Sequence, residues 1–288
     1  MPSRPLFTRT ALACTAVLLL AGTIWGQDER PSHQGFNCFF GTLHAHSALS
    51  GDFEPGIGRR QLQNLLENDF EGAFNLTNGP LQAWTHAAEQ AKIDFVALTD
   101  HIRAPGSGDS EGDVGMPLRG YDLLRDAAAR INGDSRFRGR FLAIPGMEWN
   151  VGRQGNHINI LFARREVPRT IQNGDFVTLR NRYFNNPDFE AGNSLLCVQM
   201  NHPRDMRLDY GRAQFAATPA GTNAFVSDFR DVYLGVEHIN NHDQGNQNQA
   251  ERNDHRNGNQ LEDDYKRYLN LGFRVAPVGD RECLKANG

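Results

Sequence analysis

The amino-acid sequence predicts an α/β fold built on a parallel sheet. Several apolar runs are continuous rather than alternating, which is typical of strands buried on both faces. Helical patterns lie between some of these runs, and strands that alternate with helices favour a parallel sheet. The number of runs favours a barrel, with an open sheet as the alternative. The predicted strands are 35–47, 92–101, 140–150, 156–163, 193–203, 231–240 and 272–280.

Three segments between the predicted strands have helical patterns. The segment 79–92 begins with Gly-Pro, and 261–272 ends at a glycine, which are typical signals of helix boundaries. The segment 120–132 carries apolar residues along one helical face. Residues 240–264 are polar and rich in Asn, Gln and Asp, and residues 102–119 are rich in Gly, Asp and Pro. Both predict long solvated loops.

The N-terminal segment predicts a secretory signal peptide over residues 1–26. Arg4 and Arg9 precede an uncharged apolar run at 11–25, and a small residue and a polar stretch follow. The apolar run is short for a membrane span, so a retained anchor is the less favoured alternative. We therefore expect one domain over residues 27–288 in the periplasm or outside the cell, with no stable membrane span after cleavage.

The composition argues against several classes of protein. The chain of 288 residues has a formal net charge of −4, so it has no overall positive field to attract nucleic acid or an anionic membrane. Beyond the predicted signal peptide, Cys38, Cys197 and Cys283 remain, and an odd number cannot all form internal disulfides. Cys38 and Cys197 lie in apolar runs, which favours free buried thiols. Neither a disulfide framework nor a cysteine-based zinc site is predicted.

Histidines and acidic residues lie at the ends of the predicted strands. The carboxyl ends of parallel strands meet at one rim in barrels and doubly wound sheets, so these side chains are expected to converge. His157 differs from the others because it begins its strand. In chain order the ends carry His44 and His46, Asp100 and His101, Glu148, Asn201 and His202, Glu237, and Asp280 with Glu282 just beyond.

The pattern His44-Ala-His46 predicts a metal site. Residues i and i+2 of a strand point the same way, so both imidazoles can hold one ion. Imidazole and carboxylate ligands suit Zn, Mn or Fe, and a carboxylate such as Glu148 can bridge two ions. A single histidine at a strand end is more often an ordinary polar residue, but the complete set predicts a metal centre. The histidines interpreted as lying outside it are His33, His86, His238, His242 and His255.

A set of motifs occurs in a fixed order along the chain: LHAHSALSGD, DFVALTDH, PGMEWN, GNHINIL, NHP, GVEHIN and YLNLGFRVAPVGD. They span about residues 36–284. With these motifs the chain resembles the PHP (polymerase and histidinol phosphatase) superfamily of metal-dependent phosphoesterases, and it is most similar to the secreted branch that includes CehA/McbA-like metallohydrolases. The resemblance implies a distorted (β/α)7 TIM-like barrel and a site for two or three divalent metal ions.

The resemblance also implies roles for individual residues. Asp100 would orient a ligand imidazole, and Glu237, with Asn240, matches a family pattern near the site without a defined role. The implied ligands are His44 and His46 for a first ion, Glu148 as the bridge to a second, His157 and His202 for the second, and Asp52 and His101 for a third. The residues implied to be catalytic are His44, His46, Glu148 and His202.

The last motif departs from the family pattern. Where the family carries Asp and His ligands after a glycine, this chain has Glu282 and Leu284. Glu282 keeps a carboxylate that can still bind metal, whereas Leu284 has no ligand atom, so the third site is expected to be weak or empty. A shifted alignment would give the Asp role to Asp280 and the His role to Glu282. The chain stops soon after Leu284, so a C-terminally truncated barrel is an open alternative.

The expected function is a metal-dependent hydrolase with a small-molecule substrate. A metal-activated hydroxide would attack a phosphate ester, or a related activated ester or carbamate. Arg103 and Arg204 follow implied ligands and are interpreted either as phosphate-binding residues or as ordinary surface arginines.

Two other functions are weighed against hydrolysis. Glu282 and Leu284 support a degenerate secreted scaffold that binds metal or ligand without turnover. A nuclease-like or polymerase-associated role is disfavoured by the predicted signal peptide and by the absence of a basic patch in the sequence. The sequence predicts neither the natural substrate nor the oligomeric state.

Overall fold

The computed structural model describes residues 32–33, 36–50, 57–102, 115–150, 157–171, 175–184, 197–201, 233–240, 265–266, 269–270 and 274–280. The predicted signal peptide, most of the two predicted loops, and Asp52, Arg103, His202, Arg204, Glu282 and Leu284 lie outside these residues. No helix within the described stretches combines the length and the apolar composition that a bilayer crossing requires.

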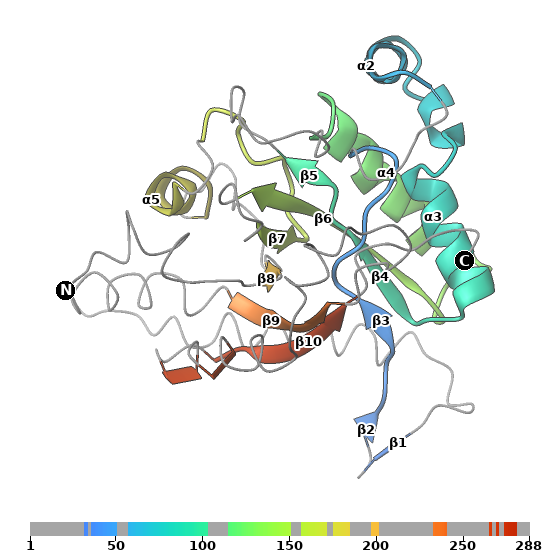
Figure 1. Cartoon of the computed structure of the whole chain (residues 1–288). Helices are drawn as coiled ribbons and strands as arrows, with labels where there is room; N and C mark the ends of the chain where they lie inside the picture. Colours follow the sequence, from blue (N-terminus) through green and yellow to red (C-terminus); the bar gives the residue numbers. More distant parts are fainter. Residues whose placement is uncertain are drawn as a thin grey trace, which may run out of the picture.

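A mixed sheet forms the centre of the fold, and its strands follow a curled path (Figure 1). The hydrogen-bonded order is β10-β9-β8-β7-β6-β4-β3, and β5 pairs with β6 beside this path. Each predicted strand segment contains a strand of the path. The strands are β3 (Gly41–Thr42), β4 (Phe95–Leu98), β5 (His101–Ile102), β6 (Leu142–Asn150), β7 (His157–Leu161), β8 (Cys197–Asn201), β9 (Tyr233–Asn240) and β10 (Ala276–Asp280). A separate antiparallel pair is formed by β1 (Ser32–His33) and β2 (Phe36–Asn37).

The prediction of a wholly parallel sheet is wrong at β7. This strand runs antiparallel to both β6 and β8, whereas the other pairs along the path, and β5 with β6, are parallel. Only residues 151–156 separate β6 from β7, and a parallel connection needs a crossover of about a dozen residues or more. The α/β class is confirmed. A seven-unit barrel stays a prediction, because no pairing joins β10 to β3 among the described residues.

The helices differ in how closely they follow the sequence patterns. The predicted helix at 120–132 is present as α4 (Gly120–Gly133). The predicted helix at 79–92 is divided into α3 (Pro80–His86) and a π-helical turn, η2 (Ala87–Ala91). Lys92, which follows η2, has a left-handed backbone with φ of 52°. Within 261–272, residues 265–266 and 269–270 are described, and they are helical. The remaining helices of the described residues are α2 (Arg59–Asn68), η1 (Gly72–Asn75), α5 (Phe176–Leu179) and η3 (Arg180–Phe184).

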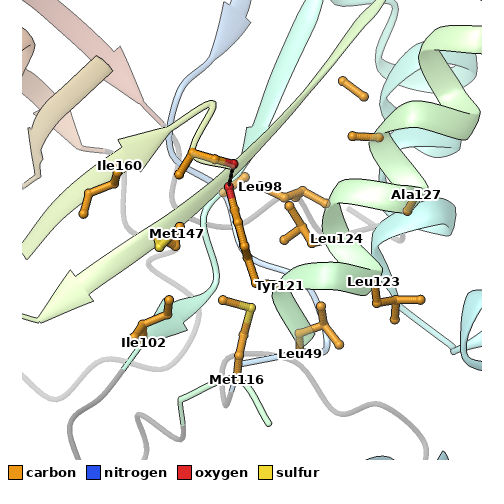
Figure 2. Close-up of a cluster of buried hydrophobic side chains, with 14 of the residues drawn as sticks. Leu49, Leu98, Ile102, Met116, Tyr121, Leu123, Leu124, Ala127, Met147 and Ile160 are labelled. Atoms are coloured by element: carbon orange, nitrogen blue, oxygen red, sulfur yellow. Dashed lines mark hydrogen bonds between the residues drawn. The ribbon is translucent and has the colours of Figure 1, made fainter. Parts of the chain in front are cut away.

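Side chains of the strands alternate between two buried faces. On one face Leu98, Met147 and Ile160 belong to the main core with α4, where the Tyr121 hydroxyl donates a hydrogen bond to the Ala163 carbonyl at 2.7 Å (Figure 2). The other face carries a smaller apolar cluster of Ala97, Ile144, Leu161 and Cys197. Burial on both faces explains why these strands appear in the sequence as continuous apolar runs.

Gly146 of β6 lies where no side chain fits. A Cβ atom placed there would lie 2.8 Å from Leu161 Cδ2 and 2.8 Å from Thr99 Cγ2. We expect Gly146→Ala to lower the free energy of unfolding by about 1–3 kcal/mol, as overpacking of cores does, measured by urea unfolding. Gly133→Ala is the matched control, because nothing lies within 4 Å of its Cβ position. Equal midpoints for Gly146→Ala and the parent would contradict the tight packing at this position.

Candidate metal centre

Glu148 lies at the centre of a buried cluster of four imidazoles. Its Oε2 atom lies 3.4 Å from His44 Nε2, 3.2 Å from His46 Nε2 and 3.1 Å from His101 Nδ1. Its Oε1 atom lies 2.9 Å from His157 Nδ1. All five side chains are buried, and the most exposed residue, His157, has a relative exposure of 6%. The structure therefore brings together five predicted site residues from distant parts of the chain.

The register of neighbouring strands places three of these residues at one rim. β5 runs parallel to β6 and pairs His101 with Glu148. Because β7 is antiparallel, His157 at its start lies opposite Asn150 at the end of β6 and Asn201 at the end of β8. A residue that begins a strand thus reaches the rim where the neighbouring strands end.

His44 and His46 lie in the loop after β3, so the prediction that they lie on a strand is wrong. Their Nε2 atoms nevertheless lie 3.1 Å apart. At the start of the loop, the Thr42 hydroxyl donates to the His44 carbonyl at 2.9 Å. In the middle, the Thr99 backbone N–H donates to the Ala45 carbonyl at 2.7 Å. These bonds fix the loop beside the end of β4. The backbone of the loop, rather than the alternation of a strand, therefore directs both rings toward Glu148.

The charge of Glu148 depends on the rings around it. Burial raises the pKa of its carboxyl, but the positive charges of His101, His44 and His157, together with the hydrogen bond from His157, outweigh burial and hold the pKa well below its ordinary value. Glu148 is therefore a carboxylate at neutral pH. A buried anion needs compensating positive charge. A bound divalent cation would supply that charge.

The donor atoms form two groups that share Glu148. One group is His44, His46 and Glu148, and the other is His101, Glu148 and His157. Within each group the ligand atoms lie within 4.8 Å of one another. Imidazole nitrogens with a carboxylate oxygen are ligands that Zn, Mn and Fe accept. The donor chemistry therefore fits divalent cations, with Glu148 in the shared position.

The remaining predicted site residues either group differently from the implied ligand sets or lie outside the described residues. His101 groups with Glu148 and His157, whereas the resemblance implies a third ion shared with Asp52. Because Asp52 lies outside the described residues, that third site stays a prediction. Glu237 lies on β9 and pairs with Val278 of β10. The roles of the remaining undescribed residues also stay predictions; they are Arg103, His202, Arg204 and Glu282.

Asp100 contacts two serines. Its carboxylate accepts hydrogen bonds from the backbone N–H of Ser47 at 2.8 Å and of Ser50 at 3.1 Å. It also accepts bonds from the hydroxyls of Ser47 at 2.8 Å and Ser50 at 2.9 Å. Ser50 Oγ in turn lies 3.3 Å from His46 Nδ1. Asp100 is therefore connected to His46 through Ser50, and its orienting role stays a prediction.

Two solved structures resemble the chain distantly. One is a two-domain protein from Bacteroides vulgatus that contains a predicted PHP-like metal-dependent phosphoesterase; the match covers 90% of this chain and 56% of that protein, with 17% identity and a TM-score of 0.46. The other, from Bifidobacterium adolescentis, was proposed to be a metal-dependent phosphoesterase; the match covers 88% of this chain and 89% of that protein, with 13% identity and a TM-score of 0.37.

The two structural similarities are too distant to indicate the chemistry of this chain. No protein-family model matches the sequence, and no curated protein matches it. This chain spans little more than half of the Bacteroides vulgatus protein, at 56%. The two donor groups around Glu148 are therefore the observations on which an assignment of function rests.

Three buried amides lie beside the cluster; Asn159 and Asn201 belong to the motifs GNHINIL and NHP, but none of the three was predicted to be a site residue. Asn201 Nδ2 donates to Glu148 Oε1 at 2.8 Å and to Asn159 Oδ1 at 2.7 Å. Gln199 Nε2 donates to Asn201 Oδ1 at 3.2 Å. The available signal was the spacing of polar residues by two within apolar runs, His157 with Asn159 and Gln199 with Asn201, which places them on one strand face. Ser47 and Ser50 gave no comparable signal.

Proposed function

We infer that the chain is a metal-dependent hydrolase of the PHP type that acts on a phosphate ester. The observation that carries this inference is Glu148, a fully buried carboxylate shared by two groups of imidazole ligands. Burying so many ionisable groups is costly without compensating charge, and paired metal ions with such ligands occur in phosphatases and nucleases. The ordered motifs of the sequence support the PHP assignment, including the secreted CehA/McbA-like branch.

Each part of the cluster has a defined task in this proposal. The residues that would hold the ions are His44, His46 and Glu148 for one, and His101, Glu148 and His157 for the other. When bound, divalent cations supply a water-derived nucleophile near neutral pH and stabilise charge on the substrate oxygens. Glu148 keeps the two groups together: Asn201 Nδ2 donates to its carboxylate, and the pairing of β6 with β7 fixes its backbone. The buried surroundings strengthen every electrostatic interaction at the site.

The proposal extends to substrate, metal and location. A related activated ester or carbamate would need the same nucleophile as a phosphate ester, so these are the alternative small-molecule substrates. Zn, Mn and Fe are the proposed metals, because all accept imidazole and carboxylate ligands. The net charge of −4 argues against a nucleic-acid substrate. The predicted signal peptide supports a periplasmic or secreted enzyme.

Elemental analysis of the purified protein tests the metal centre. We expect about two ions per chain in the parent, as in other two-metal hydrolases. His44→Ala removes a ligand from one group, so we expect about one ion or fewer and loss of phosphoesterase activity. His86→Ala is the matched control, since His86 ends α3 and is not a member of either donor group.

The possible outcomes separate the proposed functions. A parent protein that takes up no Zn, Mn or Fe after reconstitution would overturn the metal-dependent hydrolase. Bound metal without turnover of phosphate esters, carboxylate esters or carbamates would instead favour the degenerate scaffold. Equal metal content in His44→Ala and the parent would show that the ions bind elsewhere.

A further inference from the structure

We propose that Asn159 and Asn201 act as one positioning unit, which ties the carboxylate of Glu148 to the loop that carries His44 and His46. Neither amide is assigned as a ligand, so both are positioning residues that act through their partners. The part of the inference that concerns metal affinity rests on the proposed metal centre. The hydrogen bonds themselves belong to the metal-free protein and can be tested without a metal ion.

The strand register brings the two amides together beside Glu148. Asn159 of β7 pairs with Glu148 of β6 on one side and with Gln199 of β8 on the other. Asn201 lies two residues beyond Gln199 on β8, so the side chains of these two residues point to the same face of the sheet. The exposure of Asn159, Asn201 and Glu148 is 0%. The hydrogen bonds between these side chains are therefore shielded from solvent.

A backbone carbonyl fixes the orientation of the first amide. Asn159 Nδ2 donates to the Leu43 carbonyl at 2.9 Å. A carbonyl oxygen can only accept, so the NH₂ group of Asn159 faces Leu43 and its Oδ1 atom faces the other way. Leu43 directly precedes His44 in the chain, so this bond holds the start of the loop that carries the two histidines.

The second amide joins the first to Glu148. Asn159 Oδ1 can only accept, so the atom of Asn201 that lies 2.7 Å from it is Nδ2. The same NH₂ group donates its other proton to Glu148 Oε1, at 2.8 Å. The orientation of both amides thus follows from the Leu43 carbonyl and does not depend on the protonation of any ligand.

The chain of bonds runs from Leu43 through the two amides to Glu148. It joins the loop of His44 and His46 to the carboxylate that both donor groups share. Breaking either link leaves a buried polar atom without its partner, and the amide that remains no longer connects the loop to Glu148. Amides that merely filled space in the core would each make a separate contribution. A positioning unit instead predicts that loss of either amide has nearly the same effect as loss of both.

Hydrogen exchange in the metal-free protein tests the connection to the loop. The Thr99 backbone N–H donates to the Ala45 carbonyl of the loop at 2.7 Å, so its exchange with solvent reports opening of the loop. We expect faster exchange at Thr99 in Asn159→Ala. We expect it in Asn201→Ala as well, although the Asn201 amide donates to Asn159 and Glu148 rather than to the loop.

Asn132→Ala is the control for loss of an amide that bonds to β6. Asn132 of α4 donates to the Ala143 carbonyl at 2.8 Å and accepts from the Ala143 backbone N–H at 2.9 Å. We expect this variant to keep both the exchange at Thr99 and the metal affinity of the parent. Asn201→Ser replaces Asn201→Ala if the alanine variant does not fold, because one hydroxyl proton can make only one of the two bonds that Asn201 donates.

Titration with Zn²⁺ or Mn²⁺ tests the connection to the metal centre. We expect Asn159→Ala and Asn201→Ala each to weaken metal binding by about 10–100-fold, as loss of outer partners of ligands does. We expect the double variant to bind within about twofold of the weaker single variant, because effects within one connected network do not add.

The results that would overturn the proposal are distinct from those that would overturn the proposed function. Unchanged exchange at Thr99 in Asn201→Ala would refute the positioning unit, and so would losses of metal affinity that multiply in the double variant. Equal weakening of metal binding in Asn132→Ala would do the same, because any amide beside β6 would then have this effect. A parent that binds neither metal but shows the expected exchange in both variants would refute the hydrolase and retain the positioning unit.

Discussion

Glu148→Gln is expected to remove metal from both donor groups at once. Glu148 is the residue that the two groups share, and it contacts the imidazoles through both carboxylate oxygens. An amide has one oxygen and one NH₂ group, so one side of the residue loses its ligand atom and the negative charge is lost. We expect metal affinity to fall by more than about 100-fold, beyond the loss typical of an outer partner. Elemental analysis and titration with Zn²⁺ or Mn²⁺ measure it.

Glu166→Gln is the matched control for that experiment. Glu166 is also a poorly exposed carboxylate, but its ionic partner is Arg169, at 2.5 Å, and it belongs to neither donor group. We expect it to keep the metal content of the parent. Parental metal content in Glu148→Gln would contradict the central position of Glu148. Loss confined to one ion per chain would mean that the two groups do not share this carboxylate as a ligand.

Trp84→Ala is expected to cause the largest loss of stability. Trp84 of α3 is completely buried, and its Nε1–H donates to the Val96 carbonyl of β4 at 3.0 Å. Removing the ring leaves a large cavity between this helix and the sheet. We expect the free energy of unfolding to fall by about 3–5 kcal/mol, as for other buried aromatic residues, in urea unfolding. Because β4 leads directly to Asp100 and His101, weaker metal binding is expected as well.

Trp84→Phe separates the two contributions of the tryptophan. Phenylalanine keeps most of the apolar ring and lacks the N–H that donates to Val96. Loss of a buried hydrogen bond costs about 1–3 kcal/mol when a group is left unsatisfied, so Trp84→Phe should be less damaging than Trp84→Ala. A change below about 1 kcal/mol in Trp84→Ala would contradict the packing of α3 on β4, given the cost of cavities of this size.

The direction of β7 illustrates what local sequence patterns miss. The run at 156–163 predicts a buried strand, and β7 is one. An apolar run indicates that a strand is buried, but it does not indicate whether the strand pairs parallel or antiparallel with its neighbour. The short connection at 151–156 was the available signal, since it is too short for a crossover. An antiparallel β7 also places His157, at the start of this strand, at the rim where β6 and β8 end.

The sequence by itself determined the α/β class, the strand segments and the residue types of the candidate metal centre. These properties are carried by neighbouring residues: apolar runs encode burial, and histidines and acidic residues stand at the strand ends. The ordered motifs extended this to a family resemblance, with His44, His46 and Glu148 as implied ligands.

Only the tertiary structure decided how those residues meet. Glu148 became the shared residue because β5, β6 and β7 pair in one register, and Ser50 became the partner of His46 because Asp100 lies beside the loop. Ser50 and Asp100 are 50 residues apart in the chain. Partners at such separations are set by strand pairing and chain reversal, which depend on the global balance of burial and hydrogen bonding rather than on local residue order.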